Sequence, residues 1–265
     1  MQVQLVQLGA GDGPALMAWL GASAMVDPLL LSRLARLGGD PRIKFWALRG
    51  QKDFLAVLAA DGSDWVVSSP GQANAYPLAE LLDRQSSGTI RGEAKTVGDL
   101  LRQLKAERLT DRTCLLVRLS EGDLPAGDPK GRAKDIRHLD HDSLASLFAD
   151  PGMSDLREAP GLGGMSFGSL HAVALYDHER PAALAWTEAE ASNLARIGGL
   201  WTVPSHRRQG WGLSCLWALC QELSKEGITS EITYDDPAIG RLVGRLGFRP
   251  SGRWRRVDFR KPGEL

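Results

Sequence analysis

Residues 197–223 read IGGLWTVPSHRRQGWGLSCLWALCQEL, and this stretch decides the fold of the second half of the chain. An apolar run leads to a proline and a turn of basic residues and glycines, and an amphipathic segment comes next, which predicts strand, turn and helix in succession. Gly210 and Gly212 fall where the turn becomes the helix, so the unpaired amides of the first helical turn are open to a ligand. Arg207 and Arg208 add positive charge, and such a helix end suits a pyrophosphate carried by a nucleotide-like cofactor.

The sequence after this stretch predicts one more strand, one more helix and a final strand. Residues 229–234 are β-prone. Asp236 followed by Pro237 is typical of a helix start, with an acidic N-cap and a proline at the first helical position. Gly247 is placed to end that helix in a left-handed conformation, and residues 252–259 are expected to form the last strand.

Length and charge limit the classes of protein that need to be considered. The 265 residues favour two domains. Lys plus Arg equals Asp plus Glu, 32 against 32, so no global charge draws the protein to nucleic acid or to an anionic membrane. The three cysteines and the scattered histidines lack metal-ligand spacing, so we expect no metal site and reduced thiols. No leader-like start or long apolar segment is present, and a cytoplasmic protein is expected.

The clearest break in the chain lies at residues 121–134, which are rich in Gly, Pro and charge. It predicts two domains, residues 1–120 and residues 135–265, joined by this linker. Both halves are expected to begin with a strand and a helix and to continue with a strand meander. A duplicated fold with one decayed copy is one hypothesis, and two unrelated domains are the other, because the identity between the halves is too low to prove a repeat.

The second half resembles the GNAT superfamily of N-acetyltransferases. The acetyl-CoA motif of that family is Arg or Gln, two variable residues, Gly, one variable residue, and Gly or Ala, and RRQGWG at residues 207–212 satisfies it. Pro204 and the strand before the motif, the helix after it and the LGF ending at residues 246–248 extend the resemblance over most of residues 133–265. The resemblance implies an α/β fold with a mixed sheet, in which the strand before the motif splays from its neighbour.

The resemblance also implies a cofactor site for acetyl-CoA, the acyl donor. The strand edge would pair with the pantetheine arm, and the turn and first helical residues would hold the pyrophosphate. The implied cofactor-binding residues are Trp201, Thr202, Val203, Arg207, Arg208, Gln209, Gly210, Trp211, Gly212 and Leu213.

The catalytic side chains are less clear, because this chain departs from the family pattern. In many members, a tyrosine four positions before the glycine of the LGF ending acts as the general acid. Here that position is Val243. Tyr234, at the end of a strand beside the cofactor, is a weak candidate for the acid that protonates sulfur. Glu188 and Glu190, expected in a loop ahead of the long strand, are weak candidates for the base that acts on the substrate amine.

The sequence is compatible with two functions from different classes. The first is an acetyl-CoA-dependent N-acetyltransferase that acts on a primary amine of a small molecule or peptide. The second is a catalytically silent acyl-CoA-binding regulatory module, favoured by Val243. The first half lacks the cofactor motif and resembles the decayed amino-terminal copy of tandem GNAT proteins. A homodimer is left open.

Overall fold

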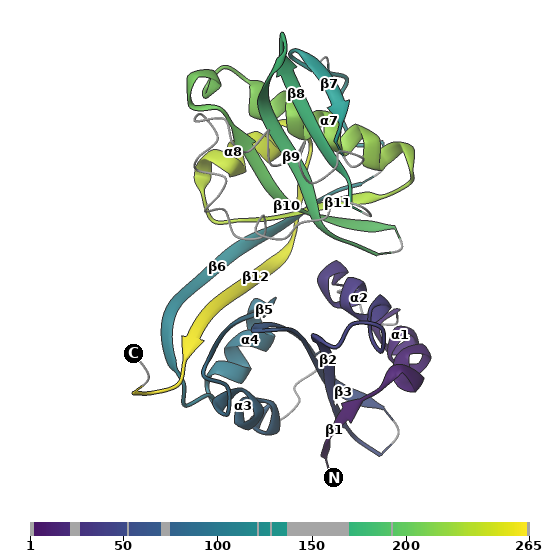
Figure 1. The fold of residues 1–265 in the computed structure, drawn as a ribbon, viewed down its shortest axis with the longest axis vertical. Helices are drawn as coiled ribbons and strands as arrows, with labels where there is room; N and C mark the ends of the chain where they lie inside the picture. The colour runs from purple at the N-terminus through teal and green to yellow at the C-terminus, as the bar shows by residue number, and fades with distance from the viewer. Residues whose placement is uncertain are drawn as a thin grey trace. The chain divides into compact units, whose positions relative to one another are not determined.

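The computed structural model describes residues 3–21, 27–51, 53–69, 75–120, 122–127, 129–136, 170–191 and 193–263. These residues form two compact units (Figure 1). Unit 1 comprises residues 1–116 and 251–265, and unit 2 comprises residues 117–250. Within the described segments, no helix is both long and apolar enough to cross a membrane.

Unit 1 is a mixed sheet with two short helices beside its first strands and two beside β4 and β5. Its elements are β1 (Gln4–Leu8), η1 (Ala10–Asp12), α1 (Gly13–Gly21), α2 (Pro28–Ala35), β2 (Ile43–Arg49), β3 (Phe54–Asp61), β4 (Asp64–Ser68), α3 (Tyr76–Asp83), β5 (Ser87–Glu93), α4 (Ala94–Leu101) and β6 (Glu107–Leu119). The strand order is β1-β2-β3-β4-β5-β12-β6, and β4 and β5 are parallel.

Unit 2 repeats this order of elements. Its elements are β7 (Arg132–Asp135), β8 (Ala172–Asp177), β9 (Arg180–Ala191), β10 (Leu194–Thr202), η3 (Pro204–His206), α7 (Trp211–Lys225), β11 (Thr229–Tyr234), α8 (Pro237–Arg245) and β12 (Arg249–Arg260). From β2 and again from β8, the chain runs strand, strand, strand, helix, strand, helix, strand. Strands β10 and β11 are parallel, as β4 and β5 are.

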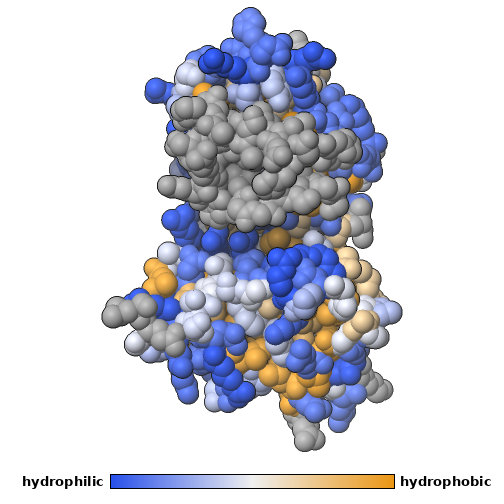
Figure 2. All heavy atoms as spheres, in the orientation of Figure 1, coloured by the Kyte–Doolittle hydropathy of each residue, from blue (hydrophilic) through white to orange (hydrophobic). Residues whose placement is uncertain are grey.

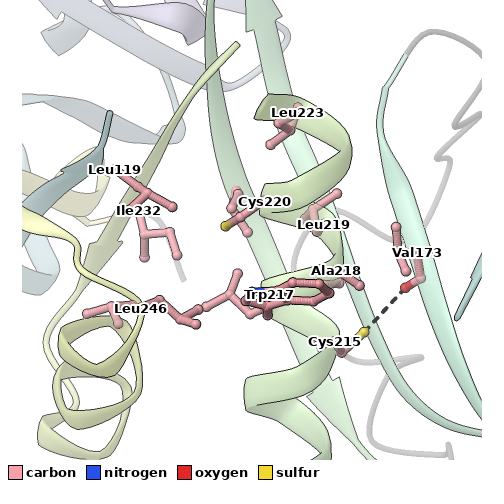
Figure 3. Close-up of a cluster of buried hydrophobic side chains, with 14 of the residues drawn as sticks. Leu119, Val173, Cys215, Trp217, Ala218, Leu219, Cys220, Leu223, Ile232 and Leu246 are labelled. Carbon is pink, nitrogen blue, oxygen red and sulfur yellow. Dashed lines mark hydrogen bonds between the residues drawn. The ribbon is translucent and has the colours of Figure 1, made fainter. Parts of the chain in front are cut away.

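The core of unit 2 forms where the apolar face of α7 packs on the sheet (Figure 3). Cys215 and Cys220 are both fully buried in it, and the Cys215 thiol donates to the Val173 carbonyl at 3.5 Å. Burial raises the pKa of both thiols, that of Cys220 to about 12, which favours their protonated, unreactive form. From the sequence, both cysteines fall in the amphipathic segment after the glycine turn, where small buried apolar residues are expected, and the structure confirms this interpretation.

The predicted helix boundaries of unit 2 agree well with the structure. The Asp236 carboxylate caps α8 by accepting the Ala238 N–H at 2.7 Å, and Gly247 has the expected left-handed φ of +87°. The visible face of the molecule is largely hydrophilic, with an apolar area on unit 1 (Figure 2).

The domain boundaries differ from the predicted ones. Residues 251–260 of β12 belong to unit 1, since β12 pairs with β5 from Trp254 opposite Glu93 to Arg260 opposite Ser87. The end of β6 in turn belongs to unit 2, beside β11. Strand β7 begins at Arg132, inside the segment predicted as a linker. The reason is physical: side-chain alternation shows that a segment is a strand but not which sheet edge pairs with it.

Strand β5 is absent from the prediction. Only Ile90 and Gly92 of its residues are buried, so it lacks an apolar run. Its glycines lie tightly against β4, since a Cβ on Gly88 or Gly92 would come within 2.6 Å of a backbone carbonyl oxygen. The strand and the helix expected at the start of the second half correspond to residues 136–139 and 143–149. Most of the strand and all of the helix lie outside the described residues.

Candidate functional site

The parallel ladder between β10 and β11 ends halfway along β10. Its last pair is Ile197 opposite Ile232, whereas β10 continues to Thr202 in contact with β9 alone. From residue 198 onward, no strand of the described part of the chain pairs with one edge of β10. This is the splay that the resemblance implied.

A pair of β-bulges lies at the same place. The register between β10 and β9 shifts on either side of Ile197. Two glycines come next, and neither position has room for a side chain. A Cβ on Gly199 would lie 1.9 Å from the Trp186 ring, and one on Gly198 would lie 2.3 Å from the Glu188 Cβ. The glycine pair thus allows the Trp186 ring and the Glu188 side chain to lie against β10.

The turn from β10 to α7 is held by contacts at both ends. The Arg207 Nε donates to the Thr202 carbonyl at 3.0 Å, and Lys130 donates to the Gln209 carbonyl. Gly210 has a φ of +91°, which is costly for any residue with a Cβ, and α7 begins at the next residue. The first amides of α7 have no acceptor within the helix and are available to an anion.

His206 fixes this turn from the side of the sheet. Its ring stacks edge-on against Trp211 with centroids 5.2 Å apart, and its Nε2 lies 3.0 Å from the Asp177 carboxylate. The hydrogen bond with His206 holds the pKa of Asp177 below its ordinary value. His206 is therefore a support of the turn, and its ring is occupied by protein contacts.

A cleft of about 580 Å³ lies between the turn, the free edge of β10 and helix α8. Its volume is typical of a small-molecule site. Its lining residues are Leu200, Trp201, Thr202, Arg207, Arg208, Gly210, Gly212, Leu213, Asp236, Ala238, Ile239, Arg241, Leu242 and Arg245.

Seven of the ten residues implied as cofactor-binding line this cleft, and Val203, Gln209 and Trp211 do not. The Val203 N–H pairs with the Ala182 carbonyl, and the Gln209 side chain donates to the Ser205 carbonyl. Trp211 is buried in the core of unit 2.

Sequence reasoning missed the wall of the cleft that α8 supplies. The signal was present, since Ala238, Arg241 and Arg245 recur at helical spacing. The sequence prediction considered only the buried face of this helix. The four arginines of the cleft outnumber its one carboxylate, Asp236, which already caps α8. The cleft is accordingly positive and suits a polyanion.

Comparison with known proteins shows which fold this geometry belongs to. Residues 172–257, from β8 through most of β12, match the family model of FR47-like proteins. No curated protein matches the chain. Three solved structures align with nearly all of it. A Drosophila protein has 14% identity and a TM-score of 0.69, covering 96% of this chain and 98% of its own. A tandem GNAT protein from the clavulanic acid biosynthesis pathway has 14% identity and a TM-score of 0.62, covering 99% and 100%. A GCN5-related N-acetyltransferase from Sphaerobacter thermophilus has 15% identity and a TM-score of 0.63, covering 99% and 97%.

The chain has the GNAT fold. Because the alignments cover at least 96% of the chain, the likeness includes the first half, as the hypothesis of a decayed copy expected. The predicted mixed α/β sheet is confirmed as well.

Among the catalytic candidates of this GNAT-fold chain, Glu190 is engaged in a buried network. Its Oε1 accepts from the His171 N–H at 2.6 Å and from the Thr187 hydroxyl at 2.5 Å, and it lies 2.9 Å from the His171 Nδ1. Burial opposes ionisation, but these contacts outweigh it and hold the pKa of Glu190 below its ordinary value. The second ring nitrogen of His171 lies 3.0 Å from Glu226 at the end of α7.

Glu188 and Tyr234 have different surroundings. Both glutamates lie in strand β9, so the loop expected for them is wrong. Glu188 lies against Gly198 at the bulge, at the head of the splay. The Tyr234 ring lies against α8, 2.9 Å from the position of a Cβ on Gly240.

Two further residues near the splay, Val243 and Glu231, make structural contacts. Val243 is buried in the core of unit 2, so the helix position where a tyrosine was expected does not line the cleft. Glu231 is fully buried on β11 and accepts from Arg196 and Arg118, each through Nε at 2.8 Å. Within the described segments, no three His, Cys, Asp or Glu side chains come together as a metal site.

Proposed function

We propose that the chain is an acyl-CoA-dependent N-acyltransferase that uses acetyl-CoA and a primary amine. The observation that carries this proposal is the arginine-lined cleft at the splay of β10 and β11. Its amides and guanidinium groups suit phosphate, and its free strand edge suits an amide-containing arm.

Strand geometry supports a pairing that we propose for the pantetheine arm. The Val203 N–H faces β9, where it donates to Ala182. Backbone groups alternate in direction along a strand, so the N–H and C=O groups of Leu200 and Thr202 face the cleft, where the Thr202 carbonyl also accepts from Arg207. The arm would then run antiparallel or parallel to residues 200–202, in place of the missing strand. The pyrophosphate would lie at Arg207, Arg208 and the first turn of α7.

The reaction proposed is direct attack by the amine. The amine nitrogen forms a bond to the thioester carbonyl carbon, the C–S bond breaks, and CoA leaves as a thiolate. A thiol with a pKa of about 8.5 is a fair leaving group without an acid, so the buried Val243 is compatible with turnover. The proton lost by the amine needs an acceptor.

We assign that role to Glu188. It lies against the bulge at Gly198, where β10 leaves β11 and the acyl end of the cofactor would lie. Glu188→Gln is expected to lower thiol release by about 100-fold, the size of a typical general-base contribution, while acetyl-CoA binding is retained. A full rate in this variant would remove Glu188 from the mechanism.

The silent acyl-CoA-binding module stays as the second candidate, because Val243 replaces the usual acid. The two are separated by measuring CoA thiol release with a panel of primary amines. Binding of acetyl-CoA without release across the panel would favour the module.

Gly210→Glu tests the cleft itself. It adds a carboxylate at the anion-binding turn, and we expect loss of the rise in melting temperature that acetyl-CoA causes. Gly62→Glu is the matched control, since Gly62 also has a positive φ, +60°, but lies in the turn between β3 and β4 of unit 1. The control should lose stability and keep the acetyl-CoA effect. If Gly210→Glu keeps it too, the cofactor lies elsewhere.

A further inference from the structure

Helix α8 presents two arginines to the cleft, one helical turn apart. Arg241 and Arg245 are both exposed and both line the cavity. Neither lies within ion-pair distance of a carboxylate in the described part of the chain. Like charges at this spacing repel each other and destabilise a helix.

The helix dipole accounts for only one of these two arginines. Arg245 occupies the last turn, where a cation interacts favourably with the helix dipole. Arg241 lies in the middle of the nine-residue helix, where the helix dipole contributes little. An anion bound between the two guanidinium groups would remove the repulsion.

The donor in the proposed function has one anionic group that the residues assigned so far do not bind. Arg207, Arg208 and the first amides of α7 are sufficient for the two charges of a pyrophosphate. Acyl-CoA carries one more phosphate, the 3′-phosphate on its ribose. A phosphomonoester carries up to two charges at neutral pH, and guanidinium groups bind such oxygens in a forked, bidentate geometry.

We propose that Arg241 and Arg245 bind the 3′-phosphate of the donor and so make the enzyme selective for 3′-phosphorylated CoA. This inference rests on the proposed function, because it assumes that the cleft holds the donor. Dephospho-CoA and an acyl group on the phosphopantetheine of a carrier protein both lack this phosphate. Both are therefore expected to be poor ligands.

The test compares the binding of CoA and 3′-dephospho-CoA by calorimetry. The wild-type protein should bind CoA at least about tenfold more tightly, the change expected for the loss of charge-assisted hydrogen bonds at a solvent-open site. Arg241→Gln combined with Arg245→Gln should weaken CoA binding by about that factor. The same double variant should leave dephospho-CoA binding unchanged, so that the selectivity disappears.

Arg249→Gln combined with Arg253→Gln is the matched control. It removes the same charge from two exposed arginines that do not line the cleft. The control should keep the selectivity. A circular dichroism melt of each variant shows that the fold is intact, and Arg241→Lys combined with Arg245→Lys should keep part of the preference.

The outcomes separate this inference from the proposed function. Equal affinity of the wild-type protein for both ligands would overturn the inference and leave the donor site standing. An equal loss for both ligands in the glutamine variant would also overturn it, because the arginines would then act on the whole charge or on the pyrophosphate. If neither CoA nor dephospho-CoA binds the wild-type protein, the proposed function itself is overturned.

Discussion

Each unit has a strand followed by a helix in the same topological place, and among the described residues the cavity beside them is far larger in unit 2 than in unit 1. In unit 2, the space between β10, α7 and α8 is about 580 Å³. In unit 1, the space between β4, α3 and α4 is about 10 Å³, room for one water molecule at most. The shared order of elements thus does not by itself make a binding site.

The difference arises just after the second strand of each parallel pair. In unit 1, α4 begins directly after β5 and inserts Leu100 toward β4. The Thr96 hydroxyl donates to the Glu93 carboxylate at 2.8 Å and lies 3.4 Å from the Ser69 carbonyl oxygen, which ties α4 to the end of β4. In unit 2, Asp235 and Asp236 separate β11 from α8, and the cleft stays open.

The strands differ as well. Strand β4 pairs with β3 in unbroken register, whereas β10 is bulged where it leaves β11. The charge differs in sign, because Asp99 is the charged residue that lines the small cavity of unit 1 and arginines line the cleft of unit 2. Unit 1 therefore has the same scaffold around a cavity that its described residues nearly fill, with a carboxylate where unit 2 has arginines.

The largest expected effect comes from truncating one leucine in each helix. Leu100→Ala empties a fully buried position of α4 and should lower the free energy of unfolding by about 2–5 kcal/mol, without changing the affinity for acetyl-CoA. Leu242→Ala removes a half-buried side chain of the cleft, so it should cost only about 1 kcal/mol and weaken acetyl-CoA binding. Urea unfolding and an acetyl-CoA titration measure both. The comparison of the two units would be wrong if Leu242→Ala cost more stability than Leu100→Ala, or if Leu100→Ala weakened acetyl-CoA binding more than Leu242→Ala.

An intermediate effect is expected at the bulge. Gly199→Ala places a methyl group inside the Trp186 ring contact and should destabilise the protein by about 1–3 kcal/mol. Gly244→Ala is the control, because this glycine lies on the exposed side of α8 with no atom within 4 Å of a Cβ. Alanine is the better helix former, so the control should gain about 0.5–1 kcal/mol. Wild-type stability in Gly199→Ala would mean that β10 does not approach β9 in this way.

The smallest effect is confined to acid pH. The folded pKa of Glu190 lies below its ordinary value of 4.5, so its contribution to stability is present above that pH and lost as the pH falls through the folded pKa. Glu190→Gln should be less stable than the wild-type protein at pH 7. The gap between their melting temperatures should shrink below about pH 4. A gap that is independent of pH would show that the ionised carboxylate adds nothing to the contacts with His171 and Thr187.

The sequence predicted the parts of the site that local chemistry determines. Gly210 before the helix, the Asp236 cap and the left-handed Gly247 each depend on neighbours within a few residues. The α8 wall was missed because helical periodicity was used only to find buried residues, and Arg241 and Arg245 are exposed. The network of Glu190 with His171 and Glu226 could not be predicted, since its members are 19 and 55 residues from His171 in the chain.

The last strand of the chain, β12, belongs mostly to unit 1, and this has a consequence for synthesis. Strand β12 lies between β5 and β6 in the sheet of unit 1, yet it is made after all of unit 2. Until β12 has been synthesised, β5 lacks this neighbour. The unpaired backbone groups along that edge of β5 then favour aggregation. A chain that ends at Pro250 lacks most of β12, so unit 1 should lose stability although it was synthesised first. Limited proteolysis of this fragment should cleave unit 1 before unit 2.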